Sequence, residues 1–345
     1  MAPVDPLIPT TVIGSYPQPG WLLDHDRLVS SGVPRVRAGD LWRVDAEHLP
    51  EAFEAAVLVA IADQEAAGID VITDGEIGRE SYFNHFATAL SGVDQDRIGT
   101  GINRAGGRSR VPVVSGPIER TSPIEVASAA FLRSHTDRAA KVTVPGPFTL
   151  SQLAQNDHYP DQRQLALAYA TAIRAELLDL AAVGIDVLQL DEPYLQANPA
   201  AARDFGLEVI ATAVEGVPAT TVVHTCYGYA QYVGTKAGGY PFLAELAHAP
   251  VDYIAIETAQ PGLDPSIVAQ LRPRSVVMGV LDLSTHEVEH PGDIAATIRS
   301  ALAHIPPAEL AVSPDCGMKF LPRAVARAKL AAMVEGAALV RAELS

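Results

Sequence analysis

The run Asp186-Val187-Leu188-Gln189-Leu190-Asp191-Glu192-Pro193 contains the pattern that decides the fold of this chain. A short, largely apolar stretch ends in two acidic residues, and a longer helical pattern over residues 161–183 precedes it. Short buried runs that alternate with helices are typical of parallel strands joined by crossover helices. The run therefore predicts a buried strand with chemically active side chains at its C-terminal end.

The same strand–helix unit recurs along the chain. We predict eight strands, at residues 10–13, 70–73, 141–144, 186–190, 219–223, 252–256, 275–280 and 310–313. We predict helices at residues 50–67, 161–183, 199–214, 241–248, 264–271, 291–304 and 322–344. Eight such units indicate an α/β fold of the TIM (β/α)8 barrel type. The alternative, an open doubly wound sheet, requires a glycine-rich phosphate-binding turn directly after a strand, and none is found.

Two long segments exceed the ordinary length of such a barrel, which is about 250 residues. Residues 16–49 follow the first predicted strand, and residues 91–121 follow the second. The second segment is rich in Gly, Arg and Ser and predicts a hairpin that acts as a lid. We expect residues 1–345 to form a single catalytic domain with insertions after strands one and two.

Composition limits the classes of partner. The chain has 345 residues, with 25 basic and 41 acidic side chains and a formal net charge of −16, and no basic cluster stands out along the sequence. Such a charge disfavours nucleic acids and anionic membranes and suits small-molecule substrates. No apolar run approaches the roughly 18–20 residues that span a bilayer, and the N-terminus lacks a signal-peptide pattern. We expect a cytoplasmic protein; monomer and homodimer are equally compatible with the sequence.

The predicted strands end in reactive residues. A lone acid or histidine at such a place is more often a helix cap or a core polar group. In a TIM barrel, however, the C-terminal ends of all strands meet at the active site, so their joint occurrence indicates catalysis. The residues in question are Ser15, Asp74, Glu76, Asp191, Glu192, His224, Cys226, Glu257, Asp282, Asp315 and Cys316.

His224 and Cys226 are one residue apart, so on an extended segment their side chains point to the same side. An imidazole with a thiolate favours Zn²⁺. Cys316 is the only other cysteine of the chain and supplies a second thiolate. A carboxylate or water completes the set, and Glu257 is the natural candidate. Ligands spread over distant strands favour a catalytic rather than a structural metal.

The chain resembles a known family at five places along its length. That family is cobalamin-independent methionine synthase, whose catalytic half is a zinc-dependent TIM-barrel methyltransferase. The similar runs are Val12-Ile13-Gly14-Ser15-Tyr16-Pro17-Gln18, Leu190-Asp191-Glu192-Pro193, His224-Thr225-Cys226, Ile256-Glu257-Thr258 and Pro314-Asp315-Cys316-Gly317.

The resemblance implies roles for individual residues. It implies His224, Cys226, Glu257 and Cys316 as zinc ligands. It implies homocysteine as the thiol substrate, with Glu76 and Asp191 holding the ammonium group, and with Ser15 and the Ile13–Gly14 backbone holding the carboxylate.

A histidine that assists protonation is a weaker part of the resemblance. His286 is similar to the family's histidine, but three residues separate Asp282 from His286 where the family has one. His290 competes for the role. Either imidazole suits general acid–base chemistry near neutral pH.

The resemblance implies a thiol S-methyltransferase of the 5-methyltetrahydropteroyltriglutamate–homocysteine type. Full-length members carry a second barrel that this chain lacks, so the donor stays open between a methyl-folate and a methylcorrinoid. Two other functions remain alternatives: zinc-dependent alkyl transfer to another thiol, as in epoxyalkane–coenzyme M transferases, and a non-catalytic zinc- or corrinoid-binding barrel.

Overall fold

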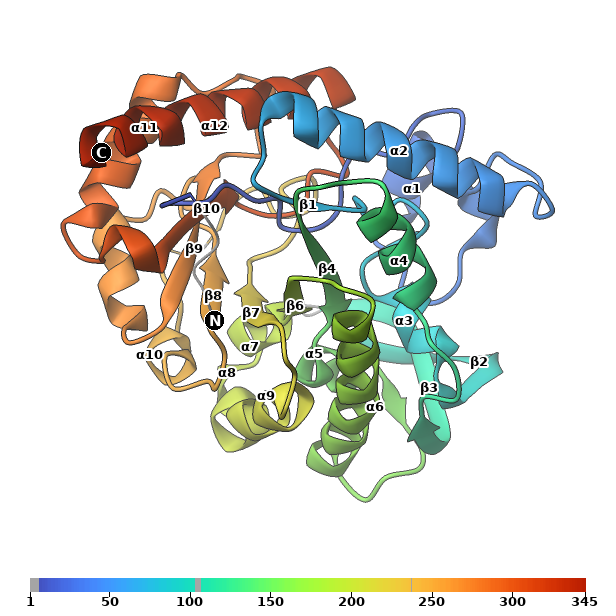
Figure 1. Cartoon of the computed structure of the whole chain (residues 1–345). Coiled ribbons are helices and arrows are strands. Elements are labelled where there is room, and N and C mark those ends of the chain that lie inside the picture. Colours follow the sequence, from blue (N-terminus) through green and yellow to red (C-terminus); the bar gives the residue numbers. More distant parts are fainter. Residues whose placement is uncertain (1–5, 103–106, 237) are drawn as a thin grey trace.

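A parallel sheet lies at the centre of the molecule (Figure 1), as seen in a computed structural model that describes residues 6–102, 107–236 and 238–345. Seven strands follow one another in the order β1-β4-β6-β7-β8-β9-β10, and each neighbouring pair is parallel. Their bounds are β1 (Val71–Thr73), β4 (Ala139–Pro145), β6 (Val187–Asp191), β7 (Thr220–Thr225), β8 (Tyr253–Ile256), β9 (Ser275–Leu281) and β10 (Leu310–Pro314). All seven coincide with predicted strands.

The first predicted strand, residues 10–13, forms only two isolated parallel bridges. Thr10 pairs with Val312 of β10, and Thr11 pairs with Val71 of β1, so this segment contacts both edges of the curled sheet. Beyond Thr11, side chains donate hydrogen bonds to the backbone of this segment. The Ile13 carbonyl accepts from Gln189, and the Gly14 carbonyl accepts from the Thr73 hydroxyl.

Helices surround the sheet on its outer side (Figure 1). Four expected long helices are present: α2 (Leu49–Ala67), α6 (Gln162–Ala182), α11 (Pro291–Leu302) and α12 (Arg323–Leu344). The helix expected at residues 199–214 consists of three parts: α8 (Pro199–Ala201), a π-helical turn (Ala202–Gly206) and α9 (Leu207–Val214). Two expected helices are shorter or tighter: α10 (Leu243–Leu246) and a 3₁₀ segment (Pro265–Leu271). Five short helices were not predicted: α1 (His25–Ser31), α3 (Asn84–Ala89), α4 (Val126–Ser134), α5 (Pro147–Gln152) and α7 (Pro193–Ala197).

The segment predicted as a hairpin is one. β2 (Ser91–Ile102) and β3 (Arg108–Glu119) pair antiparallel, and β5 (Gln155–Asn156) pairs with β3 in parallel. This small sheet stands beside the central one (Figure 1). Its action as a lid stays a prediction.

Apolar packing holds the two layers together. A large cluster fills the space between the sheet and the helices. A second, smaller cluster combines one side chain from residue 13 and one from each of six strands: Ile13, Val71, Val187, Val222, Ala255, Val277 and Ala311. Contributions from successive strands to one cluster require the sheet to curl around it. Across the described ranges, no helix has both the length and the apolar character needed to cross a bilayer.

Candidate metal centre and substrate pocket

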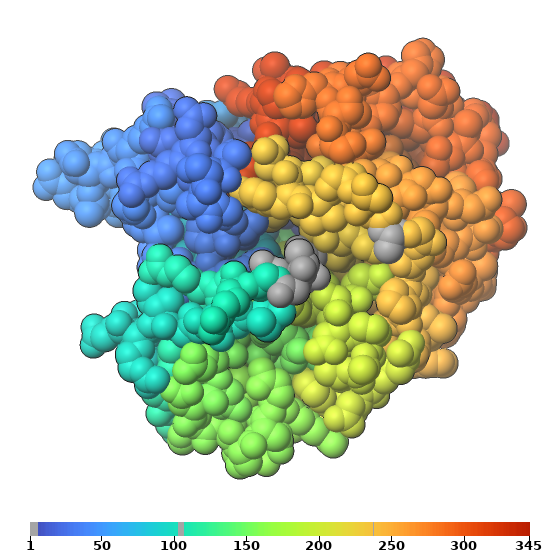
Figure 2. Space-filling view, turned by 180° about the vertical axis from the view of Figure 1, so that it is seen from behind, coloured from blue at the N-terminus to red at the C-terminus, as the bar shows by residue number. Residues whose placement is uncertain are grey.

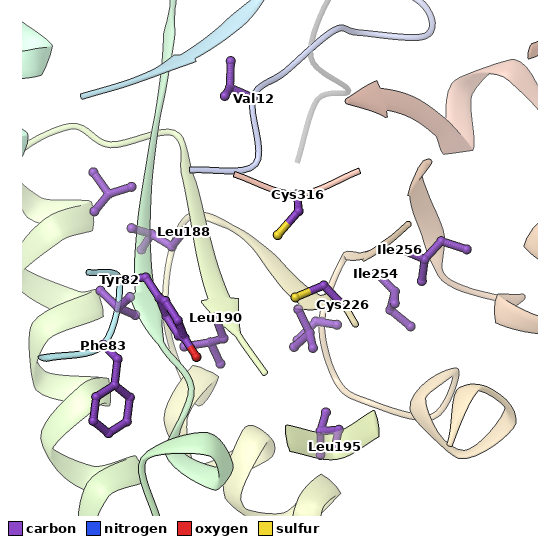
Figure 3. Packing of buried hydrophobic residues seen from close by; sticks show 14 of the residues in the cluster. Val12, Tyr82, Phe83, Leu188, Leu190, Leu195, Cys226, Ile254, Ile256 and Cys316 are labelled. Atoms are coloured by element: carbon purple, nitrogen blue, oxygen red, sulfur yellow. The ribbon is translucent and has the colours of Figure 1, made fainter. Parts of the chain in front are cut away.

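Three of the four predicted metal ligands lie together at the C-terminal ends of the strands. One ligand atom each from His224, Cys226 and Cys316 lies within 4.8 Å of the others, and all three residues are buried. His224 is on β7, Cys226 follows that strand directly, and Cys316 follows β10. Figure 3 shows both sulfur atoms directed into the same space between the strand ends.

The chemistry of this cluster fits a cation. Both ring nitrogens of His224 are buried and have no hydrogen-bond partner in the part of the chain that the structure describes. The adjacent Cys226 sulfur and burial raise the pKa of the Cys316 thiol well above its ordinary value. Two thiolates this close repel each other in a site shielded from water. The positive charge of a divalent metal offsets this repulsion, so that both thiols can be deprotonated as ligands.

Glu257 lies next to the cluster but is not among the three mutually close residues. It follows β8, and burial followed by the nearby Cys226 raises its pKa well above the ordinary value. Its Oε2 forms a buried ion pair with Lys236, whereas its Oε1 has no hydrogen-bond partner among the described residues. One carboxylate oxygen is therefore available to a metal; a ligand role for Glu257 stays a prediction.

Two residues near the cluster had no predicted individual role. Lys236 is the buried counter-charge of Glu257. Asp315 accepts hydrogen bonds from the backbone N–H groups of Thr258, Ala259 and Gln260, at 3.0, 3.0 and 2.6 Å. Asp315 thus connects the loop after Glu257 to the segment that carries Cys316. In the sequence, only its position next to Cys316 indicated that Asp315 belongs to the site.

All five predicted substrate residues line the pocket that contains the cluster: Ile13, Gly14, Ser15, Glu76 and Asp191. The two acids are buried. Burial, with a contribution from the Glu76 carboxylate, raises the pKa of Asp191 to about 7. Burial likewise raises the pKa of Glu76, and Arg79 opposes the shift. Two buried carboxylates that repel each other form a binding site for a cationic group.

A strained backbone presents Glu76 to the pocket. Its φ of +52° is unusual for a residue with a side chain. The Asp74 carboxylate holds the Glu76 N–H at 2.9 Å, and the Thr143 hydroxyl donates to Glu76 Oε1 at 2.6 Å. Arg79 is fully buried behind them and donates to the Thr143 carbonyl at 2.8 Å. Strain of this kind persists only where the surroundings enforce it, which is common at functional sites.

Ser15 also lines the pocket, with its hydroxyl 3.3 Å from that of Tyr229. Close contacts surround it: a β-carbon on Gly317 would lie 2.1 Å from Ser15 Oγ. The Ile13 carbonyl is engaged by Gln189, which also donates to Asp191. One amide side chain therefore connects the segment predicted to hold the carboxylate with the residue predicted to hold the ammonium group.

The predicted histidine does not line this pocket. His286 is exposed, in the loop after β9, and is not among the lining residues. His290 caps α11, where its Nδ1 accepts from the Gly292 N–H at 3.0 Å. The role expected for His286 stays a prediction. His290 has a structural role as the N-cap of α11.

Comparison with known proteins gives a consistent result. The family model described as the catalytic domain of cobalamin-independent synthase matches residues 8–339. The chain is 34% identical to a methionine synthase of Sulfolobus acidocaldarius over 98% of this chain and 94% of that protein. It is 32% identical to one of Sulfurisphaera tokodaii, with the same coverage. The structure of a B12-independent methionine synthase from Shewanella sp. W3-18-1, in complex with selenomethionine, is similar with a TM-score of 0.88 at 31% identity, over 98% of this chain and 99% of that one.

Proposed function

Because this chain belongs to the cobalamin-independent methionine synthase family and is a methyltransferase, we propose that it methylates the thiol of homocysteine with the help of a bound zinc ion. The single observation that carries the proposal is the shared pocket. A His-Cys-Cys cluster and two buried carboxylates line the same cavity, so a thiol and an ammonium group of one small molecule can be bound together.

We propose the following division of roles. His224, Cys226 and Cys316 hold zinc, with Glu257 Oε1 as the fourth ligand. When bound, zinc supplies the positive charge that keeps a thiol deprotonated near neutral pH, where a free thiol with a pKa of about 8.5 is mostly protonated. Glu76 and Asp191 bind the ammonium group, and Ser15 with the backbone of Ile13 and Gly14 binds the carboxylate. These contacts fix the substrate so that its sulfur faces the cluster.

The fold that we propose for this chemistry is one catalytic TIM barrel. Residues 10–13 take the place of the eighth strand between β10 and β1, and the β2–β3 hairpin is an insertion that covers the mouth. The Shewanella protein, whose complex contains selenomethionine, supports a pocket that accepts the methylated product, because selenomethionine is an analogue of methionine.

The pocket argues against the epoxyalkane–coenzyme M alternative. The thiol of that reaction carries a sulfonate, which calls for a cationic side chain beside the metal. The described residues that line the pocket include Glu76 and Asp191 but no lysine or arginine, and the nearby cation Lys236 is already paired with Glu257. A purely metal-binding role leaves these two buried acids without a purpose.

X-ray absorption at the zinc edge tests the proposal. Purified protein is expected to contain about one zinc per chain, and homocysteine is expected to add one sulfur to the zinc coordination sphere. Cys316→Ser should lose zinc, whereas an exposed serine variant such as Ser345→Ala should not. A zinc environment that homocysteine leaves unchanged would contradict the assignment.

A further inference from the structure

A second and much larger cavity lies outside the metal pocket. Its volume is about 610 Å³, against about 30 Å³ for the inner pocket, and it falls in the range of cavities that hold cofactor-sized ligands. Three segments supply most of its lining, namely residues 27–41, the start of β3 and the loop after β7, and Tyr194 of α7 completes it. Figure 2 shows these segments, in blue, teal and yellow, converging on one face of the molecule. We call this cavity the vestibule.

The vestibule concentrates positive charge in an acidic protein. Five arginines line it with one acid, Asp40, although the chain as a whole has a net charge of −16. They are Arg27, Arg35, Arg37, Arg108 and Arg110.

Two of these arginines are neutralised by neighbours and three are not. Arg27 pairs with Asp40, and Arg37 lies 3.4 Å from Glu80. Within the ranges that the structure describes, Arg35, Arg108 and Arg110 have no carboxylate partner in an ion pair. Arg108 and Arg110 are two positions apart on β3, so their side chains leave the strand on the same face. Three guanidinium groups without an ion-pair partner among the described residues favour a ligand that carries anionic groups.

The vestibule is connected to the metal pocket through tyrosines. Tyr229 lines both cavities. Arg35 donates to the hydroxyl of Tyr82 at 3.2 Å, and Tyr82 lines the inner pocket. Tyr194 and Tyr232 add further aromatic surface to the vestibule, on which a planar ring system can stack. A ligand in the vestibule therefore lies next to the site where the thiol would react.

We infer that the vestibule is the binding site of the methyl donor, and that Arg35, Arg108 and Arg110 bind an anionic group of this donor. The inference rests on the proposed function, since it assigns the second substrate of that reaction. The anionic groups have two possible sources, the carboxylates of a γ-glutamyl tail or the phosphodiester of a complete corrinoid. Both would place the methyl-bearing part of the donor toward Tyr229.

Direct binding to the zinc-loaded protein tests this inference. Calorimetric titrations would use 5-methyltetrahydrofolate with one and with three glutamates, and methylcobalamin beside methylcobinamide, which lacks the phosphodiester. We expect one pair to show tighter binding of its more anionic member, with an affinity that falls as salt rises. The pair that shows this difference identifies the source of the charge.

The double variant Arg108→Gln/Arg110→Gln should weaken that binding at least tenfold and abolish the difference within the pair. Arg163→Gln/Arg174→Gln, which removes two exposed arginines of α6, should bind as the unmodified protein does. Unchanged affinity in the first variant, or no binding of either anionic donor, would overturn the inference. The zinc–sulfur signal with homocysteine is a separate readout, so its loss would count against the proposed function and not against the vestibule.

Discussion

Gly14 is in such close contact with Glu76 that a β-carbon at this position would lie 2.3 Å from Glu76 Oε1. We therefore expect Gly14→Ala to displace the Glu76 carboxylate from the pocket and to raise the KM for homocysteine at least tenfold, with zinc content unchanged. Steady-state kinetics with metal analysis would measure both. Gly20→Ala is the matched control, because a β-carbon there meets no atom within 4 Å. Equal KM values for the two variants would remove Glu76 from the substrate site.

The buried pair of Lys236 and Glu257 gives a second prediction at this scale. Lys236→Met leaves the Glu257 carboxylate buried without its counter-charge, which costs about 3–5 kcal/mol when no metal is present. Urea unfolding of chelator-treated protein would measure the loss, and Lys236→Met/Glu257→Gln should recover most of it. If Glu257 is a zinc ligand, Lys236→Met should still bind zinc, because the variant keeps the Glu257 carboxylate. Loss of zinc in Lys236→Met would contradict the ligand role of Glu257.

Glu125 adds a prediction for pH. Burial raises the pKa of this carboxyl to about 7, although Arg79 opposes the shift. Between its ordinary value and pH 7 the folded protein therefore binds a proton that the unfolded chain has lost, so this contribution to stability is present at pH 5 and lost as pH rises through 7. Relative to Glu125→Gln, the unmodified protein should lose about 1–3 kcal/mol of unfolding free energy from pH 5 to pH 8. A difference that is constant with pH would show that Glu125 is ionised throughout.

The site residues differ in how far the sequence reveals them. Residues at strand ends were predictable because a parallel barrel brings all its C-terminal strand ends together, so His224, Cys226 and Cys316 follow from the strand assignment alone. Lys236 was not predictable: it lies in a loop, and only the folded chain places it against Glu257. Residues in loops lack a periodic pattern that fixes where they point.

At the scale of the elements, Asp70 connects the segment that replaces the eighth strand to the rest of the fold. Its Oδ2 accepts from the Thr10 N–H at 2.8 Å, from the Thr10 hydroxyl at 2.7 Å and from Arg341 of α12 at 2.6 Å. Asp70→Ala should lower the unfolding free energy by about 2–4 kcal/mol, because several charge-assisted hydrogen bonds are lost together. Glu343→Ala breaks an exposed ion pair with Arg299 and should have a much smaller effect, because solvent screens such a pair. Urea titrations of both variants would measure the two losses of unfolding free energy. If Asp70→Ala loses no more than Glu343→Ala, residues 10–11 are held by packing alone.

The long elements were predictable and the short ones were not. α6 and α12 bury one face over many turns, which leaves a periodic pattern in the sequence. α5 begins at Pro147 directly after a strand end and has only six residues, too few for such a pattern. The first strand, at residues 10–13, was predicted too long for a related reason: its apolar residues continue to Ile13, while its backbone pairing ends at Thr11.

At the scale of the whole molecule, charge is distributed in a way that composition conceals. The sequence shows no basic cluster, because the arginines of the vestibule come from two segments about 70 residues apart and are separated by acidic stretches. Only the approach of the β2–β3 hairpin to residues 27–41 creates a positive cavity within an acidic protein. The charge of the donor site was therefore inaccessible from the sequence, whereas the ligand set of the metal was accessible.

Removal of the metal tests the distinction between a catalytic and a structural zinc in the molecule as a whole. The proposed ligands lie at strand ends, and although Cys226 and Cys316 belong to the large apolar cluster, most of that cluster packs between sheet and helices without them, so we expect the fold not to depend on the metal. A chelator should lower Tm by about 5–10 °C, the loss of a tightly bound ligand, and leave the circular dichroism spectrum at 20 °C unchanged. Cys316→Ser should have the lower Tm at the outset and show no response to the chelator. A chain that unfolds when zinc is removed would mean that the metal holds strands β7 and β10 together, and the catalytic assignment would then need support from activity alone.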